Sequence, residues 1–526
     1  MEVLSPLATD YLAGQPHSYI APSDGTTYYH PINYSANVED VQLYNEGGHY
    51  PVHLGANLDN RFTVVHKLGS GGYGIVWLCR DTYLEKWRAV KILTANQTAK
   101  GTENKIICDL QKRFTEDELE RNHILLPLER FWLTSPNGTH LCLVMPVLGP
   151  AVSSWRLKQK DYEEQTHHDT RNLCRQIMAS MHFLHRHGIC HGDFRPANIL
   201  MKIEGIDHLS QDQLLELMGE PECIGIEPLP GQSPTYRAPD YCVVPAHEFW
   251  SMPLSTKSIR IIDFGESFFT EDPPKSTGIP DSYAAPEVLL EGIGNLGTHT
   301  DIWSLACTLF EVRTGSKLVE DQLCGGFSDS LGEIEFYLGP LPSRYRMPYD
   351  TMHSSIPPAS LLGSGGPETQ LDIQDYTPEE QLQPDALDQD YYKEARAELR
   401  EKSGYQDIFQ AVLGQERTLY CNLNTAEKPE VIKYRYPQKD VLGLADLLKK
   451  MLKYDPKDRI DINSVVSHYW LGRRSKGNTR GNTRGSTRGN TRGKLKSKDD
   501  GVRVVVVAIA VTVLILHFHK FGKKGM

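Results

Sequence analysis

The sequence predicts an α+β fold, with a strand-rich N-terminal part followed by a larger, mainly helical part. Three early runs, FTVVHKL, YGIVWLCRD and WRAVKIL, are rich in β-branched and aromatic residues and are separated by turn-forming residues, which predicts an antiparallel meander. Further along, apolar residues recur every three to four positions and predict an amphipathic helix, at Leu173, Ile177, Met181 and Leu184.

Composition excludes a disordered or fibrous chain, because 39% of the 526 residues are apolar and 23% are charged. The net charge of −11 is uneven, since residues 472–526 carry 14 Lys and Arg against 2 Asp, which leaves −11 − 12 = −23 for the rest. An acidic body disfavours direct nucleic-acid binding and favours basic partners. The ten cysteines form no CxxC pair, as expected of reduced thiols in an intracellular protein.

Changes of pattern along the chain predict its organisation. We expect an extended arm (1–50), a strand-rich lobe (51–149), a helical lobe (150–471) with insertions at about 201–257 and 321–433, a basic linker of GNTR repeats (472–503) and a short hydrophobic tail (504–526). The second insertion is acidic, because residues 368–407 contain 12 Asp and Glu against 4 Lys and Arg. It could equally be a solvated helical insertion with no specific ligand.

A glycine-rich turn lies between the first two predicted strands, with Gly69, Gly71 and Gly74 in LGSGGYGIVW. An ordinary hairpin is one explanation, and a dinucleotide-binding turn would open a helix rather than a strand. The strand context favours a hairpin that covers phosphate groups. Lys91, in AVK on the next strand, could simply extend to solvent, but Glu103 on a helix predicted from Thr102 could pair with it and orient it toward phosphates.

The segment HGDFRPANIL follows the amphipathic helix and places Asp193 and Asn198 on a loop. Asp263, in IIDFGES, follows two β-branched residues further along. Phosphoryl transfer needs an acceptor for the hydroxyl proton and oxygen ligands for Mg²⁺, and these residue types supply both. The order of the four motifs therefore predicts phosphoryl transfer from ATP.

With these motifs, the chain from about Tyr44 to Leu471 resembles the eukaryotic protein kinases, which implies a bilobal fold with a β-rich N-lobe and a mainly α C-lobe. The resemblance implies that Glu287 of YAAPE pairs with Arg459 of DPKDR, and that Asp301 of DIWS anchors the catalytic loop. It assigns Asp193, Arg195, Lys91 and Glu103 to catalysis, and Asn198 and Asp263 to Mg²⁺. It implies an ATP site made by Gly69, Ser70, Gly71, Gly72, Tyr73, Gly74, Val76, Ala89, Lys91, Met145, Pro146 and Leu148.

Within that family the chain looks most like SR-protein kinases, particularly their fungal relatives. The resemblance lies in GGHYPVHLG, HLCLVMPVLGP, LFEVRTGSKL, LGPLP and the insertion between Asn198 and Asp263. It implies a monomeric cytoplasmic or nuclear Ser/Thr kinase that phosphorylates Arg/Ser-rich proteins, and the acidic insertion would suit such a substrate.

Four positions depart from the family pattern. Gly192 stands where protein kinases usually have Arg, Arg195 where they usually have Lys, and Ala284 and Ala306 where Arg and Gly are more usual. Without the first Arg, a phosphorylated activation loop loses its usual anchor, so we predict activity that does not depend on loop phosphorylation. A catalytically weak pseudokinase scaffold and a small-molecule phosphotransferase of the aminoglycoside-kinase type are the alternatives.

The tail contains 13 uncharged, almost wholly aliphatic residues, from Val504 to Leu516. A helix of that length spans about 20 Å, which is short for a hydrocarbon core of about 30 Å. A tail anchor through residues 504–518, which would place the chain at a membrane, is one alternative, and a partner-binding strand or helix, or a tail with no selected role, are the others.

Overall fold

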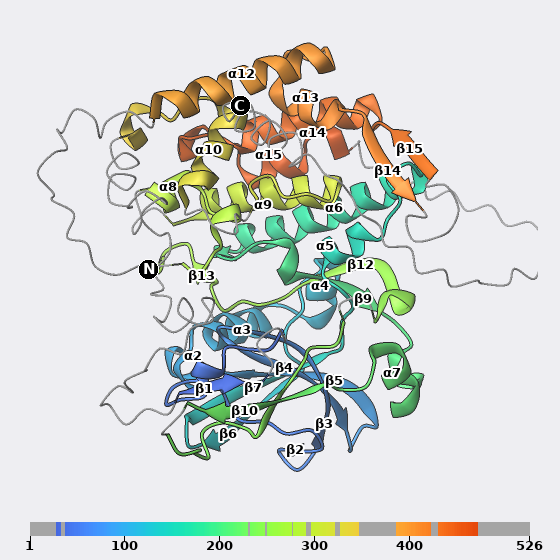
Figure 1. Ribbon diagram of the computed structural model, residues 1–526, viewed down its shortest axis with the longest axis vertical. Coiled ribbons are helices and arrows are strands. Elements are labelled where there is room, and N and C mark those ends of the chain that lie inside the picture. The colour runs from blue at the N-terminus through green and yellow to red at the C-terminus, as the bar shows by residue number, and fades with distance from the viewer. Residues whose placement is uncertain are drawn as a thin grey trace, which may run out of the picture. The chain divides into compact units, whose positions relative to one another are not determined.

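The computed structural model describes residues 28–471, except 33–36, 230–231, 248–249, 276, 291–295, 321–326, 347–384 and 422–429. These residues form two compact units (Figure 1). The first comprises residues up to Lys100, Pro127–Val147 and Met218–Ala246, and the second comprises Gly101–Leu126, Leu148–Leu217 and the residues from His247 onward. The α+β fold class, with strands early and helices late, is confirmed.

The first unit is built on an antiparallel sheet with the strand order β2-β3-β4-β5-β7-β6. Its elements are β2 (Asn57–Leu58), β3 (Phe62–Gly71), β4 (Gly74–Asp81), β5 (Lys86–Leu93), β6 (Glu129–Ser135), β7 (Gly138–Pro146) and the short helix α2 (Ala95–Lys100). The predicted meander is therefore confirmed, and the hairpin between β3 and β4 contains the glycine-rich turn.

The two faces of this sheet differ in whether they are buried in the apolar cluster. Side chains alternate along a strand, so Val90 and Ile92 of β5 lie on one face and Ala89 and Lys91 on the other. Val90 and Ile92 are 0% and 3% exposed and belong to the main apolar cluster of the unit, together with Trp77 of β4. The face with Lys91 contributes none of its β5 residues to that cluster.

The predicted arm and the first insertion cover the apolar face. In the arm, β1 (Tyr29–Pro31) pairs with β10 (Cys223–Pro228) of the insertion, and β10 pairs with β11 (Tyr241–Val243). Side chains from both segments, among them Tyr44 and Val243, are buried in the same cluster. The insertion between Asn198 and Asp263 thus returns to the first unit and completes its core.

One buried ion pair fastens the arm to the sheet. The ammonium group of Lys67 on β3 contacts the carboxylate of Glu39, and the Tyr44 hydroxyl donates a 2.6 Å hydrogen bond to that carboxylate. Burial would raise the pKa of Glu39, but Lys67 and Tyr44 together lower it below its usual value. Because a buried charge is costly without its partner, the pair requires the arm to stay in place.

The second unit is mostly helical. Its helices are α3 (Thr102–Arg113), α4 (Glu116–Arg121), α5 (Val152–Leu157), α6 (Glu164–Arg186), α7 (Gln211–Met218), α8 (Pro286–Leu290), α9 (Thr298–Thr314), α10 (Phe327–Leu338), α12 (Asp385–Ser403), α13 (Ile408–Gly414), α14 (Gln438–Met451) and α15 (Ile462–Val466). Its strands are β8 (Ile189–Cys190), β9 (Ile199–Ile203), β12 (Ser255–Ile261), β13 (Phe268–Phe269), β14 (Arg417–Cys421) and β15 (Glu430–Tyr434).

Helices α6 and α9 form the centre of this unit (Figure 1). The apolar residues predicted to mark α6 are fully buried, and α9 is buried along nearly its whole length. Within the described part of the chain, no helix combines the length and apolarity needed to cross a bilayer. The predicted linker (472–503) and tail (504–526) lie outside the described residues.

The Lys67–Glu39 pair generates a stability prediction. Glu39→Gln should lower the free energy of unfolding by about 3 to 5 kcal/mol at neutral pH, because it strands a buried ammonium group. Since the folded-state pKa of Glu39 is depressed, its contribution should be full above its unfolded pKa and should fade as the pH falls below it. Urea denaturation at several pH values measures both effects.

Glu46→Gln is the matched control, because the Glu46 side chain is 87% exposed and lies 3.7 Å from Arg237. It should change the free energy of unfolding by less than about 0.5 kcal/mol. Equal effects of the two substitutions would contradict a structural role for the buried pair.

Candidate active site

Two short strand pairs hold the loop that contains Asp193. Before the loop, β8 pairs with β13, so that Cys190 lies opposite Phe268. After the loop, β9 pairs with β12, and the amide of Ile262 donates to the carbonyl of Asn198 at 3.0 Å. This second pairing places Asn198 beside the residue that precedes Asp263.

Within the loop, the carboxylate of Asp193 is held by two neighbours. The amide nitrogen Nδ2 of Asn198 donates to the Oδ2 and the carbonyl of Asp193, at 2.7 and 2.8 Å. The Nε of Arg195 lies 2.9 and 3.1 Å from the two carboxylate oxygens. Asp193 and Asn198 are 7% and 6% exposed, so both side chains have little freedom to turn away.

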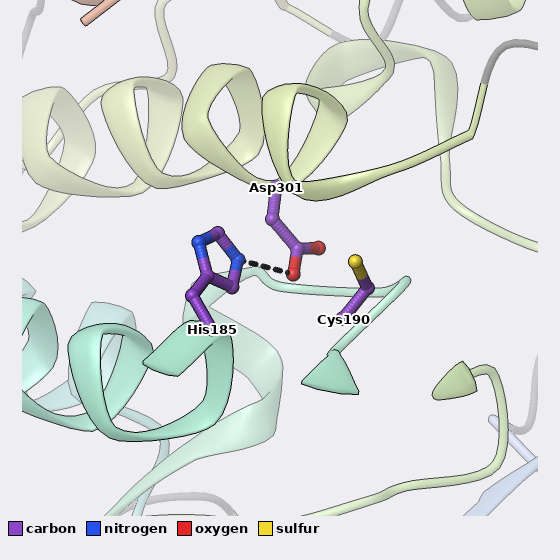
Figure 2. Close-up of side chains that lie close together, drawn as sticks. All are labelled: His185, Cys190 and Asp301. Carbon is purple, nitrogen blue, oxygen red and sulfur yellow. Dashed lines mark hydrogen bonds and ion pairs between the residues drawn. The ribbon is translucent and has the colours of Figure 1, made fainter. Parts of the chain in front are cut away.

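The loop backbone is anchored on the carboxylate of Asp301, on α9. The amides of His191 and Gly192 donate to its two oxygens at 2.7 and 3.1 Å, as the family resemblance predicted for Asp301. His185 adds a third bond, with its Nε2 2.9 Å from Oδ2 (Figure 2). Burial would raise the pKa of Asp301, but the bonds from His185 and His191 lower it.

His185 is a residue of the loop anchor that the sequence did not predict. The sequence feature that could have indicated it is its position. His185 lies in the last turn of α6, next to Leu184 of the apolar stripe, so its side chain can turn toward the core. Because a carboxylate only accepts hydrogen bonds, the Nε2 of His185 must carry the hydrogen that the bond requires.

His185, Cys190 and Asp301 have ligand atoms within 4.8 Å of one another, a grouping that could in principle hold a metal ion (Figure 2). The carboxylate of Asp301 is already occupied by two amides and an imidazole. Burial, and then the charge of Asp301, raise the pKa of the Cys190 thiol far above its usual value, which opposes the thiolate that a metal needs. The cluster is better explained as a loop anchor.

His191 connects the loop to the segment that follows Asp263. Its Nε2 lies 3.2 Å from the carbonyl of Ile262, which can only accept, so this nitrogen carries the hydrogen. Its ring lies 5.5 Å from the ring of Phe264. Asp263 itself has a φ of 65°, an uncommon left-handed backbone for a non-glycine residue.

Gly192 fits a position where a side chain has no room. Its φ is +79°, and a Cβ added there would lie 2.1 Å from the carbonyl oxygen of Glu266. The same segment bonds back to the loop, because the hydroxyls of Ser267 and Thr277 donate to the carbonyls of His191 and Gly192, at 2.8 and 3.2 Å. The amide of Gly278 donates to the carboxylate of Glu266 at 2.8 Å. The segment after Asp263 is thus held by its own residues.

In the first unit, four predicted ATP-site residues share one face of the sheet. Val76 lies opposite Lys91, and Ala89 lies opposite Met145. Ala89 and Lys91 are two positions apart on β5, and cross-strand partners point to the same side. Their face is the one opposite to the apolar cluster that the arm and the insertion cover.

The glycine positions of the β3–β4 hairpin differ in whether they have room for a side chain. At Gly69, Gly71 and Gly72 an added Cβ would meet no atom within 4 Å, so the backbone there is open. At Gly74 an added Cβ would lie 2.4 Å from the carbonyl oxygen of Ile92, so that glycine is required by the close approach of β5. Ser70 and Tyr73 complete the hairpin.

The predicted pair between Glu287 and Arg459 is confirmed. Two nitrogens of Arg459 donate to the two carboxylate oxygens of Glu287, both at 2.6 Å, and both side chains are 1% exposed. Arg459 also donates to the carbonyl of His299 at 3.0 Å. This bidentate pair ties α8 to the loop that precedes α15.

Comparison with known proteins shows what this part of the chain is similar to. Residues 62–214 and 251–330 match the family model of the protein kinase domain, and these ranges contain Lys91, Asp193, Asn198 and Asp263. The chain carries a protein kinase domain. A solved kinase-domain structure aligns with 80% of this chain and 98% of its own, at 21% identity and a TM-score of 0.46.

The kinase domain is also similar to curated relatives. It is 30% identical to SRSF protein kinase 3 of Mus musculus over 166 residues, which is 31% of this chain and 29% of the relative. It is 28% identical to Serine/threonine-protein kinase AFC3 of Arabidopsis thaliana over 299 residues, 56% of this chain and 64% of the relative. It is 31% identical to Protein kinase dsk1 of Schizosaccharomyces pombe over 170 residues, 32% and 31% of the two chains.

The match thus spans 29% of the length of the mouse relative. The predicted resemblance to SR-protein kinases is confirmed as a similarity. The predicted site residues not yet described are divided between the two units. Pro146 ends β7 in the first unit, whereas Leu148 and Glu103 belong to the second. The pairing of Lys91 with Glu103 stays a prediction.

The close approach of the Glu266 carbonyl to Gly192 predicts that a side chain at this position lowers activity. Gly192→Ala should lower the rate of phosphoryl transfer at least about tenfold, because the Cβ would push the loop away from the Glu266 carbonyl and add left-handed strain. The measurement is kcat with peptide substrate, with the melting temperature recorded in parallel.

Gly188→Ala is the matched control. Gly188 has nearly the same φ, +74°, but an added Cβ would meet only the Thr270 hydroxyl, at an ordinary 3.5 Å. It should cost stability through backbone strain and leave kcat within about twofold. Equal losses of kcat in both variants would show that strain, and not the contact with Glu266, matters.

Proposed function

We propose that this kinase is an ATP-dependent Ser/Thr protein kinase, which transfers the γ-phosphate of ATP to Ser or Thr hydroxyls of protein substrates. The observation that carries the proposal is the Asp193 carboxylate, fixed by Asn198 and Arg195 in a loop that is anchored on a buried carboxylate. The match to the protein kinase domain model supports the reaction class.

Asp193 would accept the proton of the substrate hydroxyl, or orient that hydroxyl toward the phosphorus atom. Its two neighbours fix its rotamer, so an incoming hydroxyl meets a carboxylate already in position. Arg195 would help to neutralise the transferring phosphoryl group, with a wider planar head than the usual Lys.

Asn198 and Asp263 would bind Mg²⁺. The amide nitrogen of Asn198 is committed to Asp193, which leaves its Oδ1 as the atom that can face a cation. An amide oxygen and a carboxylate are the hard donors that Mg²⁺ prefers. When bound, the ion neutralises charge on the phosphate groups.

In the first unit, the face with Val76, Ala89, Lys91 and Met145 would bind the nucleotide. Lys91 is 9% exposed on a sheet face with apolar neighbours, which strengthens its attraction to an α- or β-phosphate. The open backbone at Gly69, Gly71 and Gly72 leaves room for phosphate groups beside the hairpin.

We further propose that the substrates include Arg/Ser-rich proteins, on the strength of the similarity to proteins named SRSF protein kinase. The charge of −23 over the first 471 residues favours such basic partners. A cytoplasmic or nuclear monomer without direct nucleic-acid binding suits this role. Membrane association through residues 504–518 is the alternative location.

A radiolabelled ATP assay on an Arg/Ser-rich peptide tests the proposed function. Lys91→Met and Asp193→Ala should each lower phosphate incorporation at least about a hundredfold, since one loses a phosphate contact and the other the hydroxyl acceptor. Incorporation equal to wild type in both variants would refute the kinase assignment. A wild-type protein that binds ATP without transfer would favour the pseudokinase scaffold.

Activity should also survive phosphatase treatment. Gly192 cannot provide the usual Arg anchor. The segment after Asp263 is held instead by bonds that Ser267 and Thr277 donate to the loop and by the bond that the Glu266 carboxylate accepts from Gly278. We therefore expect a treated, re-purified enzyme to keep its rate within about twofold. A tenfold or greater loss, reversed by rephosphorylation, would contradict this.

A further inference from the structure

A pocket of about 220 Å³ lies in the second unit, away from the Asp193 loop, where four helices of the C-terminal half meet. Its walls come from the end of α10, from α12, from the start of α13 and from the end of α14, which lie together in Figure 1. No residue of the proposed catalytic machinery lines it.

The floor of the pocket is apolar. Phe409 and Leu452 are 2% and 1% exposed, and Tyr337, at the end of α10, is 9% exposed. The rings of Tyr337 and Phe409 are stacked, with their centroids 5.2 Å apart. The floor is therefore closely packed, and of these three side chains Tyr337 is the one with most surface left for a ligand.

The sides of the pocket are basic. Arg396 and Arg400 come from α12, Lys449 lies in the last turn of α14, and Lys453 follows that helix. The acidic residue in the lining is Asp407, whose carboxylate lies 2.7 Å from Lys449 and caps the first turn of α13. Four cations against one committed carboxylate leave the pocket strongly positive.

Helix α12 separates its charges by face. Glu394, Glu398 and Glu401 recur at spacings of four and three and share one side, whereas Arg396 and Arg400, one turn apart, lie on the opposite side. The acidic composition of the second insertion therefore does not describe the surface that this helix presents to the pocket.

The buried guanidinium nitrogen Nε of Arg396 has no hydrogen-bond acceptor, although a buried polar group normally has one. Neither Arg396 nor Arg400 forms an ion pair with any carboxylate that the structure describes. Burial, and then the charge of Arg400, lower the pKa of Arg396. Cations in the last turn of a helix, such as Arg400, are favoured by the helix dipole, but Arg396 lies before that turn.

We propose that this pocket docks an acidic peptide segment of a partner protein, in which carboxylates flank an apolar side chain. The carboxylates would pair with Arg396, Arg400 and Lys453, and the apolar side chain would rest against Tyr337, at the edge of the apolar floor. Cations spread along two helices suit several carboxylates on one chain better than a single dianion. Docking here requires no phosphoryl transfer, so it is measurable whether or not the proposed function holds.

Fluorescence anisotropy with the full chain tests the proposal, using a short labelled peptide in which glutamates flank a central leucine. Arg396→Gln combined with Arg400→Gln should raise Kd at least about tenfold, the loss expected for a charge-assisted hydrogen bond. Lys453→Gln, which changes an exposed side chain, should raise Kd severalfold. Circular dichroism confirms that each variant is folded.

The matched control is Lys393→Gln combined with Lys402→Gln, which removes the same charge from the same helix outside the pocket. It should change Kd less than about twofold at physiological salt, where long-range attraction is screened. Equal weakening by both double variants, or no binding by wild type, would overturn the proposal. Equal binding of a single-stranded RNA, or binding only of a phosphoserine version of the peptide, would also overturn it.

Discussion

The buried carboxylate of Asp301 is the interaction on which the catalytic part of the fold depends. It stands at the start of α9, the most completely buried helix of its unit, and accepts the amides of His191 and Gly192. A loop has few backbone hydrogen bonds of its own, so its conformation depends on bonds to other elements. Here a single charge, oriented by His185, fixes the backbone from which Asp193 and Asn198 extend.

The same principle, a flexible part fixed by a rigid buried one, operates in the first unit. The arm and the insertion bury one face of the six-stranded sheet, and the Lys67–Glu39 pair holds the arm to β3. Because side chains alternate along a strand, covering one face leaves Val76, Ala89 and Lys91 together on the other. The insertion is thus part of the scaffold that defines the proposed nucleotide face.

At Gly192, where protein kinases usually have Arg, the segment after Asp263 packs directly against the loop backbone. The carbonyl of Glu266 fills the space, and Ser267 and Thr277 bond to the loop directly. Sequence alone indicated the loss of the Arg anchor. It could not indicate this close approach, because Gly192 and Glu266 are 74 positions apart (266 − 192) and the nearest atom is the backbone carbonyl oxygen of Glu266.

The sequence by itself determined the local elements and pointed to the residues that are proposed for the chemistry. Periodicity placed the meander and α6, and the spacing of Asp193 and Asn198 put their side chains within hydrogen-bond reach, because short-range patterns dictate short-range geometry. Only the tertiary structure decided that β1 pairs with β10, that His185 meets Asp301, and that an acidic insertion presents Arg396 and Arg400 to a pocket. These contacts depend on which distant segments pair and on which face of a helix turns toward its neighbours. The composition of a segment specifies neither.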